Sequence, residues 1–269
     1  MVTKGAAHVN WTRPQTLAAL HLYLQLPFGQ LHQGNPKVKE LAGWMGRTRG
    51  AVALKLVNLS SLDPQIVASG RSGMGNASAL DRQIWAELQA DWDVVALAAA
   101  AEYERYAAAQ GVEADADLRR DAKVFEPAGF EPGVSRAALV QVRVNQARFR
   151  QAVLASYHAT CCVSGLRHEK LVIASHIVPW SEDIHNRLNP QNGLCLSALH
   201  DRAFDQGLMT VLPDYTVRVA PDLLARSRDT FMADALLRYD GARITLPERF
   251  APASGFLHWH ASHFGFIAQ

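Results

Sequence analysis

The sequence predicts an α+β protein, in which a helical N-terminal region precedes a smaller mixed C-terminal region. Three helix-start signals within the first 62 residues predict the helical part. Two short apolar runs, "KLVIASH" and "GLCLS", flank a loop and precede a helical run, which predicts strand, loop, strand and helix. We expect a helix-turn-helix or winged-helix-like domain over residues 1–80, a helical and acidic connector over 81–132, and a C-terminal domain over 133–269.

The N-terminal helices have recognisable ends. Thr12 precedes a helix that stops at Pro27, Pro36 opens a second that Gly46 breaks, and Thr48 caps a third. Two helices around a short glycine-containing turn are typical of helix-turn-helix proteins, and "ASGRSGMGNAS" would suit a wing loop. A small helical bundle with a solvated basic face is the alternative. The side chains expected to reach DNA from this region are Arg47, Arg49, Lys55 and Asn58.

Charge alternates along the chain. Residues 1–62 hold seven basic residues and one acid, residues 81–131 hold twelve acids and five bases, and residues 132–168 hold five arginines and no acid. Two basic blocks around an acidic connector are compatible with nucleic-acid contact at both, or with chance surface patterning. In the second block, Arg143 and Arg148 are the candidate DNA contacts.

Composition excludes several classes of protein. The chain has 269 residues and three cysteines. The cysteine count is odd and two of the three are adjacent, so they do not form a disulfide framework. The most apolar run, "VVALAAA", is far shorter than the roughly 20 residues that span a bilayer. We expect a soluble cytoplasmic protein with no membrane partner. A stripe of apolar residues in the connector is expected to be core or a dimer seam: Trp85, Leu88, Trp92 and Val95.

The most informative stretch is "ASHIVPWSEDIHNRLNPQNGLCLSALHDRAFDQG", residues 174–207. We expect a helix over about 144–157 before it and a hairpin over 209–221 after it. A strand ending at His176, a long loop, a second strand and a short helix make a ββα-metal arrangement. The words "SHIVPW", "NPQNGLCLS" and "LHDRAFDQG", with His176, Asn192 and His200 in order, closely resemble the HNH endonucleases. The resemblance covers about half the chain, and a looser likeness to domains placed ahead of such modules extends to the N-terminal region.

That resemblance implies hydrolysis of phosphodiester bonds with three catalytic residues. His176 stands at the position of the general base, a role that suits an imidazole with a pKa near neutrality. Asn192 would bond the backbone across the loop and keep His176 aimed. His200 would project from the helix as a ligand to a divalent metal that stabilises the leaving oxygen.

The implied metal shell is incomplete. Many HNH nucleases carry Asp or His before the base, where this chain has Ser175, a poor ligand; Asp205 could supply an oxygen. Such a shell favours Mg²⁺ or Mn²⁺, although imidazole also admits Zn²⁺ or Ni²⁺. Arg187 is a candidate phosphate clamp or a plain surface arginine. The cysteines lack the spacing of two Cys-x-x-Cys pairs, so we expect no structural zinc.

Two further expectations complete the prediction. The C-terminal "HWHASHF" is expected to be a tail docked on the core and not a metal site. The protein is expected to cut DNA in restriction of foreign or modified DNA, as a homodimer if it makes double-strand breaks. The alternatives are a non-catalytic DNA-binding regulator and a nuclease acting on RNA or single strands.

Overall fold

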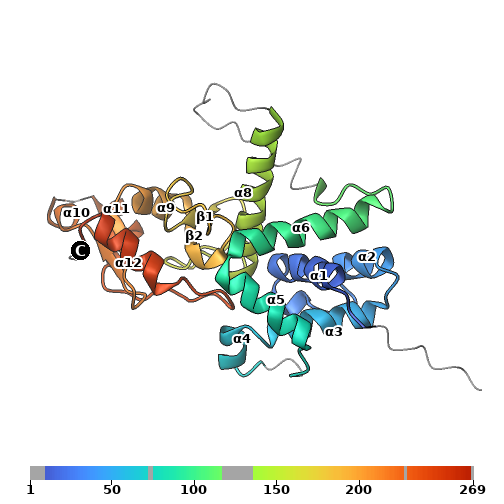
Figure 1. The fold of residues 1–269 in the computed structure, drawn as a ribbon. Helices are drawn as coiled ribbons and strands as arrows, with labels where there is room; N and C mark the ends of the chain where they lie inside the picture. The colour runs from blue at the N-terminus through green and yellow to red at the C-terminus, as the bar shows by residue number, and fades with distance from the viewer. Residues whose placement is uncertain (1–9, 72–74, 117–135, 227–228, 268–269) are drawn as a thin grey trace, which may run out of the picture.

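The computed structural model describes residues 10–71, 75–116, 136–226 and 229–267 (Figure 1). Residues 10–116 form a helical unit, and helix α8 leads into a mixed unit with two small sheets. The predicted mixture of helices and short strands is therefore confirmed. No helix in the described residues is both long and apolar enough to cross a membrane.

Helix α1 is the centre of the helical unit. Thr12 caps it in a capping box with Gln15, and every residue from Thr16 to Gln25 is buried. Helices α6, α3 and α5 pack around it, as Figure 1 shows. The unit comprises α1 (Arg13–Gln25), η1 (Phe28–Gln30), α2 (Pro36–Trp44), α3 (Arg49–Ser60), α4 (Pro64–Ala68), α5 (Ala79–Ala90) and α6 (Trp92–Ala108).

The helical unit differs from the expected domain in two respects. The turn between α2 and α3 passes through Gly46 with φ of 63°, as predicted, but no strand lies within the described part of residues 10–116, so a winged character is not confirmed. Helices α5 and α6, expected in a connector, pack on α1 and belong to the unit. The acidic stretch 117–132 lies outside the described residues.

The mixed unit is built around two antiparallel hairpins. Strand β1 pairs with β2 from Val172 opposite Ser197 to His176 opposite Gly193, and β3 pairs with β4. The predicted second strand over 193–197 and the hairpin within 209–221 are confirmed. The elements are α8 (Arg136–Ser156), β1 (Val172–His176), η2 (Pro190–Asn192), β2 (Gly193–Ser197), α9 (Ala198–Asp205), β3 (Met209–Val211), β4 (Val217–Val219), α10 (Pro221–Arg226), α11 (Thr230–Ala235), η3 (Leu237–Tyr239) and α12 (Ser254–His263).

Helix α12 is the predicted docked tail. Its His260 is buried, stacks on Phe204 with ring centroids 3.6 Å apart, and shares a 2.9 Å hydrogen bond with the Thr210 hydroxyl. This confirms that the C-terminal aromatic and histidine cluster packs on the core.

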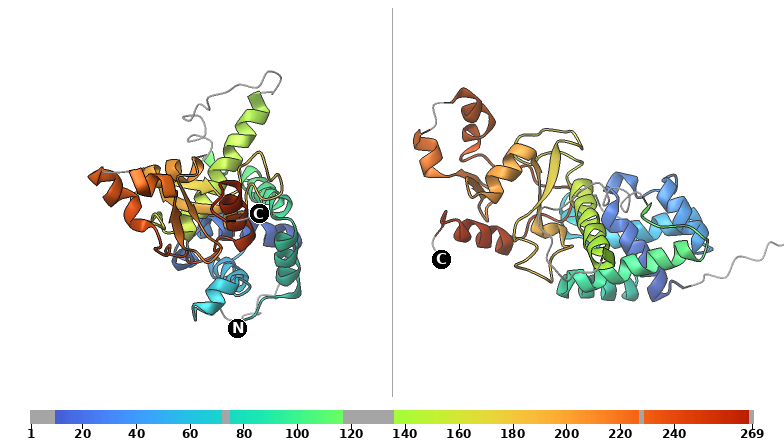
Figure 2. Two further views of the ribbon diagram at one scale, coloured as in Figure 1. Left: turned by 90° about the vertical axis from the view of Figure 1, so that its left-hand side faces the viewer. Right: turned by 90° about the horizontal axis from the view of Figure 1, so that it is seen from above.

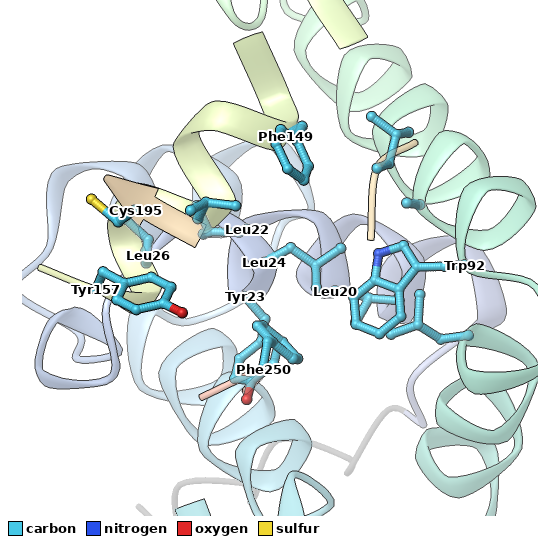
Figure 3. Close-up of a cluster of buried hydrophobic side chains, with 14 of the residues drawn as sticks. Leu20, Leu22, Tyr23, Leu24, Leu26, Trp92, Phe149, Tyr157, Cys195 and Phe250 are labelled. Carbon is cyan, nitrogen blue, oxygen red and sulfur yellow. The ribbon is translucent and has the colours of Figure 1, made fainter. Parts of the chain in front are cut away.

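One apolar core joins the two units. Phe250, from the segment before α12, packs edge-on against Tyr23 and Trp92 of the helical unit, and its ring lies nearly parallel to that of Trp85. Figure 3 shows Tyr23, Trp92 and Phe250 in one cluster with Phe149 of α8. The predicted stripe from Trp85 to Val95 is buried in this core. Figure 1 and the right-hand view of Figure 2 show α8 lying between the units.

Candidate active site

His176 lies at the end of β1, where the chain leaves the sheet. Its ring stacks on Phe149 with centroids 3.6 Å apart and planes 12° apart, and it meets Trp180 edge-on. Its Nε2 lies 3.0 Å from the carbonyl oxygen of Arg187. Because a carbonyl oxygen only accepts hydrogen bonds, Nε2 carries the proton and Nδ1 has the free lone pair. No described group forms a hydrogen bond with Nδ1.

Burial keeps the His176 imidazole neutral. Removal from water lowers its pKa from the usual 6.5 to about 4, against an opposing effect of the hydrogen bond to the Arg187 carbonyl. At neutral pH the ring is therefore unprotonated and Nδ1 can accept a proton, but with a pKa of about 4 it is a weaker base than a solvated imidazole.

Asn192 holds the chain directly after His176. Its buried side-chain oxygen accepts from the Val178 N–H at 2.8 Å, and its Nδ2 donates to the Val178 carbonyl at 3.0 Å. The Asn192 backbone carbonyl also accepts from the Ile177 N–H at 3.0 Å. Both residues that follow His176 are thus fixed by one asparagine.

Helix α9 carries two carboxylates, one of which, Asp201, lies beside Ser175 of β1. Asp201 and Asp205 are four residues apart and share a helix face. Burial raises the pKa of Asp201 most, the Asp205 charge raises it further, and the Ser175 hydroxyl lowers it. Burial likewise raises the pKa of Asp205, against the charge of Arg202. The Ser175 hydroxyl oxygen is itself buried and has no partner in normal hydrogen-bonding geometry within the described structure.

A histidine on a strand end, an asparagine across the loop and an acidic helix face form a compact ββα arrangement. Residues 161–212 match the family model HNH_2, described as HNH endonuclease. This segment is an HNH endonuclease domain. It spans β1, β2, α9 and β3, and an HNH domain indicates a nuclease. No curated protein matches the chain.

His200 points away from the acidic face of the HNH domain. It is buried, its Nε2 donates to the Ala235 carbonyl at 2.9 Å, and its Nδ1 lies 3.0 Å from the Ser197 hydroxyl. With Nε2 protonated, Nδ1 accepts from Ser197. Both ring nitrogens are occupied by protein groups, so the geometry argues against the metal-ligand role expected for His200. Asp201, its neighbour, faces the end of β1 instead.

Within the described residues, no three His, Cys, Asp or Glu side chains gather in a geometry that could hold a metal ion. A divalent ion at the HNH domain would therefore have two carboxylates at most, with its other ligands from hydroxyl, water and phosphate oxygens. Mg²⁺ commonly binds in this way, since it keeps several waters.

Arg187 lies in the loop between β1 and η2. Its Nε donates to the Trp180 carbonyl at 2.8 Å, and the guanidinium carbon lies 5.2 Å from the centroid of the Trp180 ring. The arginine is half-buried and braces the loop, while its backbone carbonyl holds His176.

Most of the arginines and lysines expected to contact DNA have structural partners. Lys55 is buried and pairs with Asp81 at 2.6 Å, and Arg47 donates to Gln15 at 2.7 Å. Asn58 is also buried, so these three residues do not form the expected exposed reading face of α3. Arg49 is exposed.

In helix α8 the two candidate DNA contacts also face inward. Arg148 is buried and ion-paired with Glu104 and Asp115, which makes it a link between α8 and the helical unit. Arg143 is half-buried. Neither presents the open basic surface that the arginine-rich block predicts.

Two acidic residues of this region were missed by the sequence reasoning. Asp201 had a signal, because "HDRAFD" places two carboxylates four residues apart on a helix. Asp93 had none: it lies 95 positions before Leu188, whose backbone N–H it accepts at 2.7 Å. Only the packing of α6 on the loop of the HNH domain reveals this contact.

Proposed function

We propose that this protein is a divalent-metal-dependent HNH nuclease that hydrolyses phosphodiester bonds in DNA, with His176 as the general base. The observation that carries the proposal is the neutral His176 ring, held at Nε2 and open at Nδ1, within the segment that matches the HNH endonuclease family model. A water placed against Nδ1 would lose a proton to it as the oxygen attacks phosphorus. A positioned base of this kind contributes about 10²–10⁴ in rate.

Asn192 is the positioning residue for the chain beyond His176. Its amide bonds both backbone groups of Val178, so the turn out of β1 has one conformation. A fixed turn keeps Nδ1 aimed at the attacking water, and small displacements of a catalytic group are costly in rate.

The residues at the end of β1 fit a divalent cation. Asp201 and Asp205 repel each other, a cation would relieve that repulsion, and the unpartnered Ser175 hydroxyl supplies a further oxygen. We propose these three residues as the metal-binding set, with Asp201 in place of His200. An oxygen-only set favours Mg²⁺ or Mn²⁺. When bound, the ion would supply Lewis-acid stabilisation of the charge on the scissile phosphate.

The biological setting proposed is restriction of foreign DNA, including DNA that carries modified bases. Arg187 is proposed as a phosphate contact and Arg49 as a DNA contact of the helical unit, since both reach the surface. Cutting both strands at one place would need two active sites and hence a homodimer on DNA.

Plasmid cleavage with Mg²⁺, Mn²⁺ or EDTA tests the function. Wild type should be compared with His176→Ala and with His168→Ala, an exposed histidine of the same unit. We expect metal-dependent cutting that only the His176 variant loses. Substrates should include unmodified and cytosine-modified plasmid, single-stranded DNA and RNA. Tight DNA binding without any cutting would favour the regulator, whereas cutting of RNA alone would identify an RNA nuclease.

A further inference from the structure

The loop that holds His176 is tied to the helical unit at one residue. Asp93 lies in the first turn of α6, where its side chain is buried. Its carboxylate accepts the Leu188 N–H at 2.7 Å, and its own N–H donates to the His185 carbonyl at 3.4 Å. The loop of the HNH domain thus satisfies one of the free N–H groups at the start of α6.

The Leu188 N–H and the Arg187 carbonyl belong to the same peptide group. A trans peptide is planar, so its N–H and its C=O point in opposite directions. Here the N–H points to the Asp93 carboxylate and the C=O points to Nε2 of His176, 3.0 Å away. One peptide plane therefore separates a buried negative charge from the imidazole.

This arrangement has a direct electrostatic consequence. A carboxylate that accepts from a peptide N–H polarises the peptide and makes its carbonyl oxygen a stronger acceptor. A stronger acceptor holds the Nε2 proton more firmly and stabilises the imidazolium that forms when Nδ1 takes a proton. Buried carboxylates that orient a catalytic histidine directly are known in hydrolases, and here the contact would pass through a peptide.

We infer that Asp93 is a positioning residue for His176, acting from the helical unit through the 187–188 peptide, so that the nuclease centre is complete only when both units are docked. The catalytic half of this inference depends on the proposed function of His176. Its structural half, the effect of Asp93 on the imidazole, does not.

The surroundings of Asp93 raise its pKa on balance, because burial outweighs the groups that favour the carboxylate. Burial raises its pKa, while the backbone N–H groups of Leu188 and Arg187 and the Arg187 side chain favour the ionised form. The N-terminal end of α6 also favours a negative charge at this position. The charge of Asp91, the cap of the same helix, opposes ionisation of Asp93.

Three variants separate the possibilities. Asp93→Asn keeps an oxygen for the Leu188 N–H but removes the charge, whereas Asp93→Ala removes both. Asp91→Asn is the matched control, because it removes a charge two positions away, 3.8 Å from the exposed His185, and keeps an oxygen for the Val94 N–H that Asp91 accepts at 3.2 Å. Asparagine caps helices as well as aspartate does, so the control should fold normally.

Two readouts are needed. We expect Asp93→Ala to lower kcat by about 10- to 100-fold with KM nearly unchanged, since a displaced base weakens the transition state and not DNA binding. Asp93→Asn should lower kcat less, because an oxygen remains for the Leu188 N–H. Independently of activity, the His176 Nε2–H resonance in nitrogen-labelled protein should move upfield in both variants and stay in place in Asp91→Asn.

The outcomes are distinguishable. An unchanged imidazole resonance and unchanged kcat in folded Asp93→Asn and Asp93→Ala would overturn the inference. If Asp93→Ala fails to fold, Asp93→Asn alone decides in the same way. A shifted resonance in a protein that cuts no nucleic acid would retain the contact between Asp93 and His176 but refute the proposed function.

Discussion

Arg249 places its guanidinium at the C-terminal end of helix α1, with Nη1 2.6 Å from the carbonyl oxygen of Tyr23. Its Nη2 donates to the carbonyls of Leu24 and Leu26, and the side chain is fully buried. A cation at this end complements the helix dipole and satisfies carbonyls that lack partners within the helix.

Arg249→Ala should therefore destabilise the whole protein. Hydrogen bonds from a charged group contribute about 1.5–3 kcal/mol, so loss of several should lower the free energy of unfolding by about 3 kcal/mol or more. Urea unfolding measures this, with Arg243→Ala as control, because the exposed Arg243 side chain donates to a single carbonyl, that of Asp214, within the described part of the chain. Equal effects of the two substitutions would contradict the capping role of Arg249.

Lys55 and Arg49 should separate stability from DNA binding. Removal of Lys55 leaves the Asp81 carboxylate buried and unpaired, which costs about 3–5 kcal/mol. Arg49→Ala should leave stability within about 0.5 kcal/mol of wild type but weaken DNA binding. It should also reduce the slope of log affinity against log salt by about one. Thermal melts and fluorescence titrations at several salt concentrations test both. If removal of Lys55 instead weakened DNA binding without loss of stability, the predicted DNA-reading face of α3 would be supported.

Asp201→Asn should impair metal dependence, whereas His200→Gln should impair folding. We expect Asp201→Asn to lower the cleavage rate about a hundredfold or more and to raise the Mg²⁺ concentration at half-maximal rate, since a carboxylate ligand is lost. His200→Gln breaks buried hydrogen bonds to Ala235 and Ser197, so its melting temperature should fall while its Mg²⁺ requirement stays. A Mg²⁺ requirement changed only by His200→Gln would return the ligand role to that histidine.

Gly193→Ala should disturb the ring that stacks on His176. A Cβ at position 193 would lie 2.6 Å from Cγ2 of Val153 and 2.9 Å from Cζ of Phe149, so α8 or the strand must shift. Overpacking of this kind costs about 1–3 kcal/mol, and the shift of Phe149 should lower kcat as well. Gly43→Ala is the control, because nothing lies near its added methyl group and alanine favours helix α2. Normal activity of Gly193→Ala would show that the stacking is dispensable.

Acid should destabilise the protein through its buried histidines. Burial lowers the pKa of His176 and of His260 to about 4, against 6.5 for a solvated histidine. As pH falls from about 6.5 to 4, these two histidines become protonated in the unfolded chain but stay neutral in the folded protein. Stability contributed by each neutral ring is therefore complete above pH 6.5 and decreases by up to about 1.4 kcal/mol per pH unit below it. His260→Gln should show a shallower pH dependence of the unfolding free energy than wild type, and an identical slope would contradict the prediction.

Local sequence signals predicted many of the helices and strands in both units. The run "GLCLS" bounded by Asn192 and Ala198 has the apolar content of a buried strand, and residues 193–197 form that strand. Capping residues such as Thr12 and Thr48 marked helix starts because a cap depends on only three or four neighbouring positions. Apolar strand runs and helix caps depend on neighbouring residues alone, so they can be predicted without knowledge of the tertiary fold.

Side-chain direction was harder to predict. Lys55 and Asn58 have polar side chains that usually face water, yet α3 turns them inward because α5 supplies Asp81 as a buried partner for Lys55. The choice between His200 and Asp201 depends on about 100° of rotation around α9, which the motif alone does not settle. Asp93 could not be found at all, because its contact joins segments far apart in the chain.

The position of Phe250 in the aromatic cluster has a consequence for biosynthesis. A ribosome delivers Tyr23, Trp85 and Trp92 long before it delivers Phe250, so the helical unit emerges with an unfilled core. By the time that core is completed, the whole HNH segment has already left the exit tunnel. Chains terminated early would lack Arg249 and Phe250 and would be substrates for proteolysis. The HNH domain would thus become part of a stably folded protein only after the segment with Arg249 and Phe250 has been synthesised.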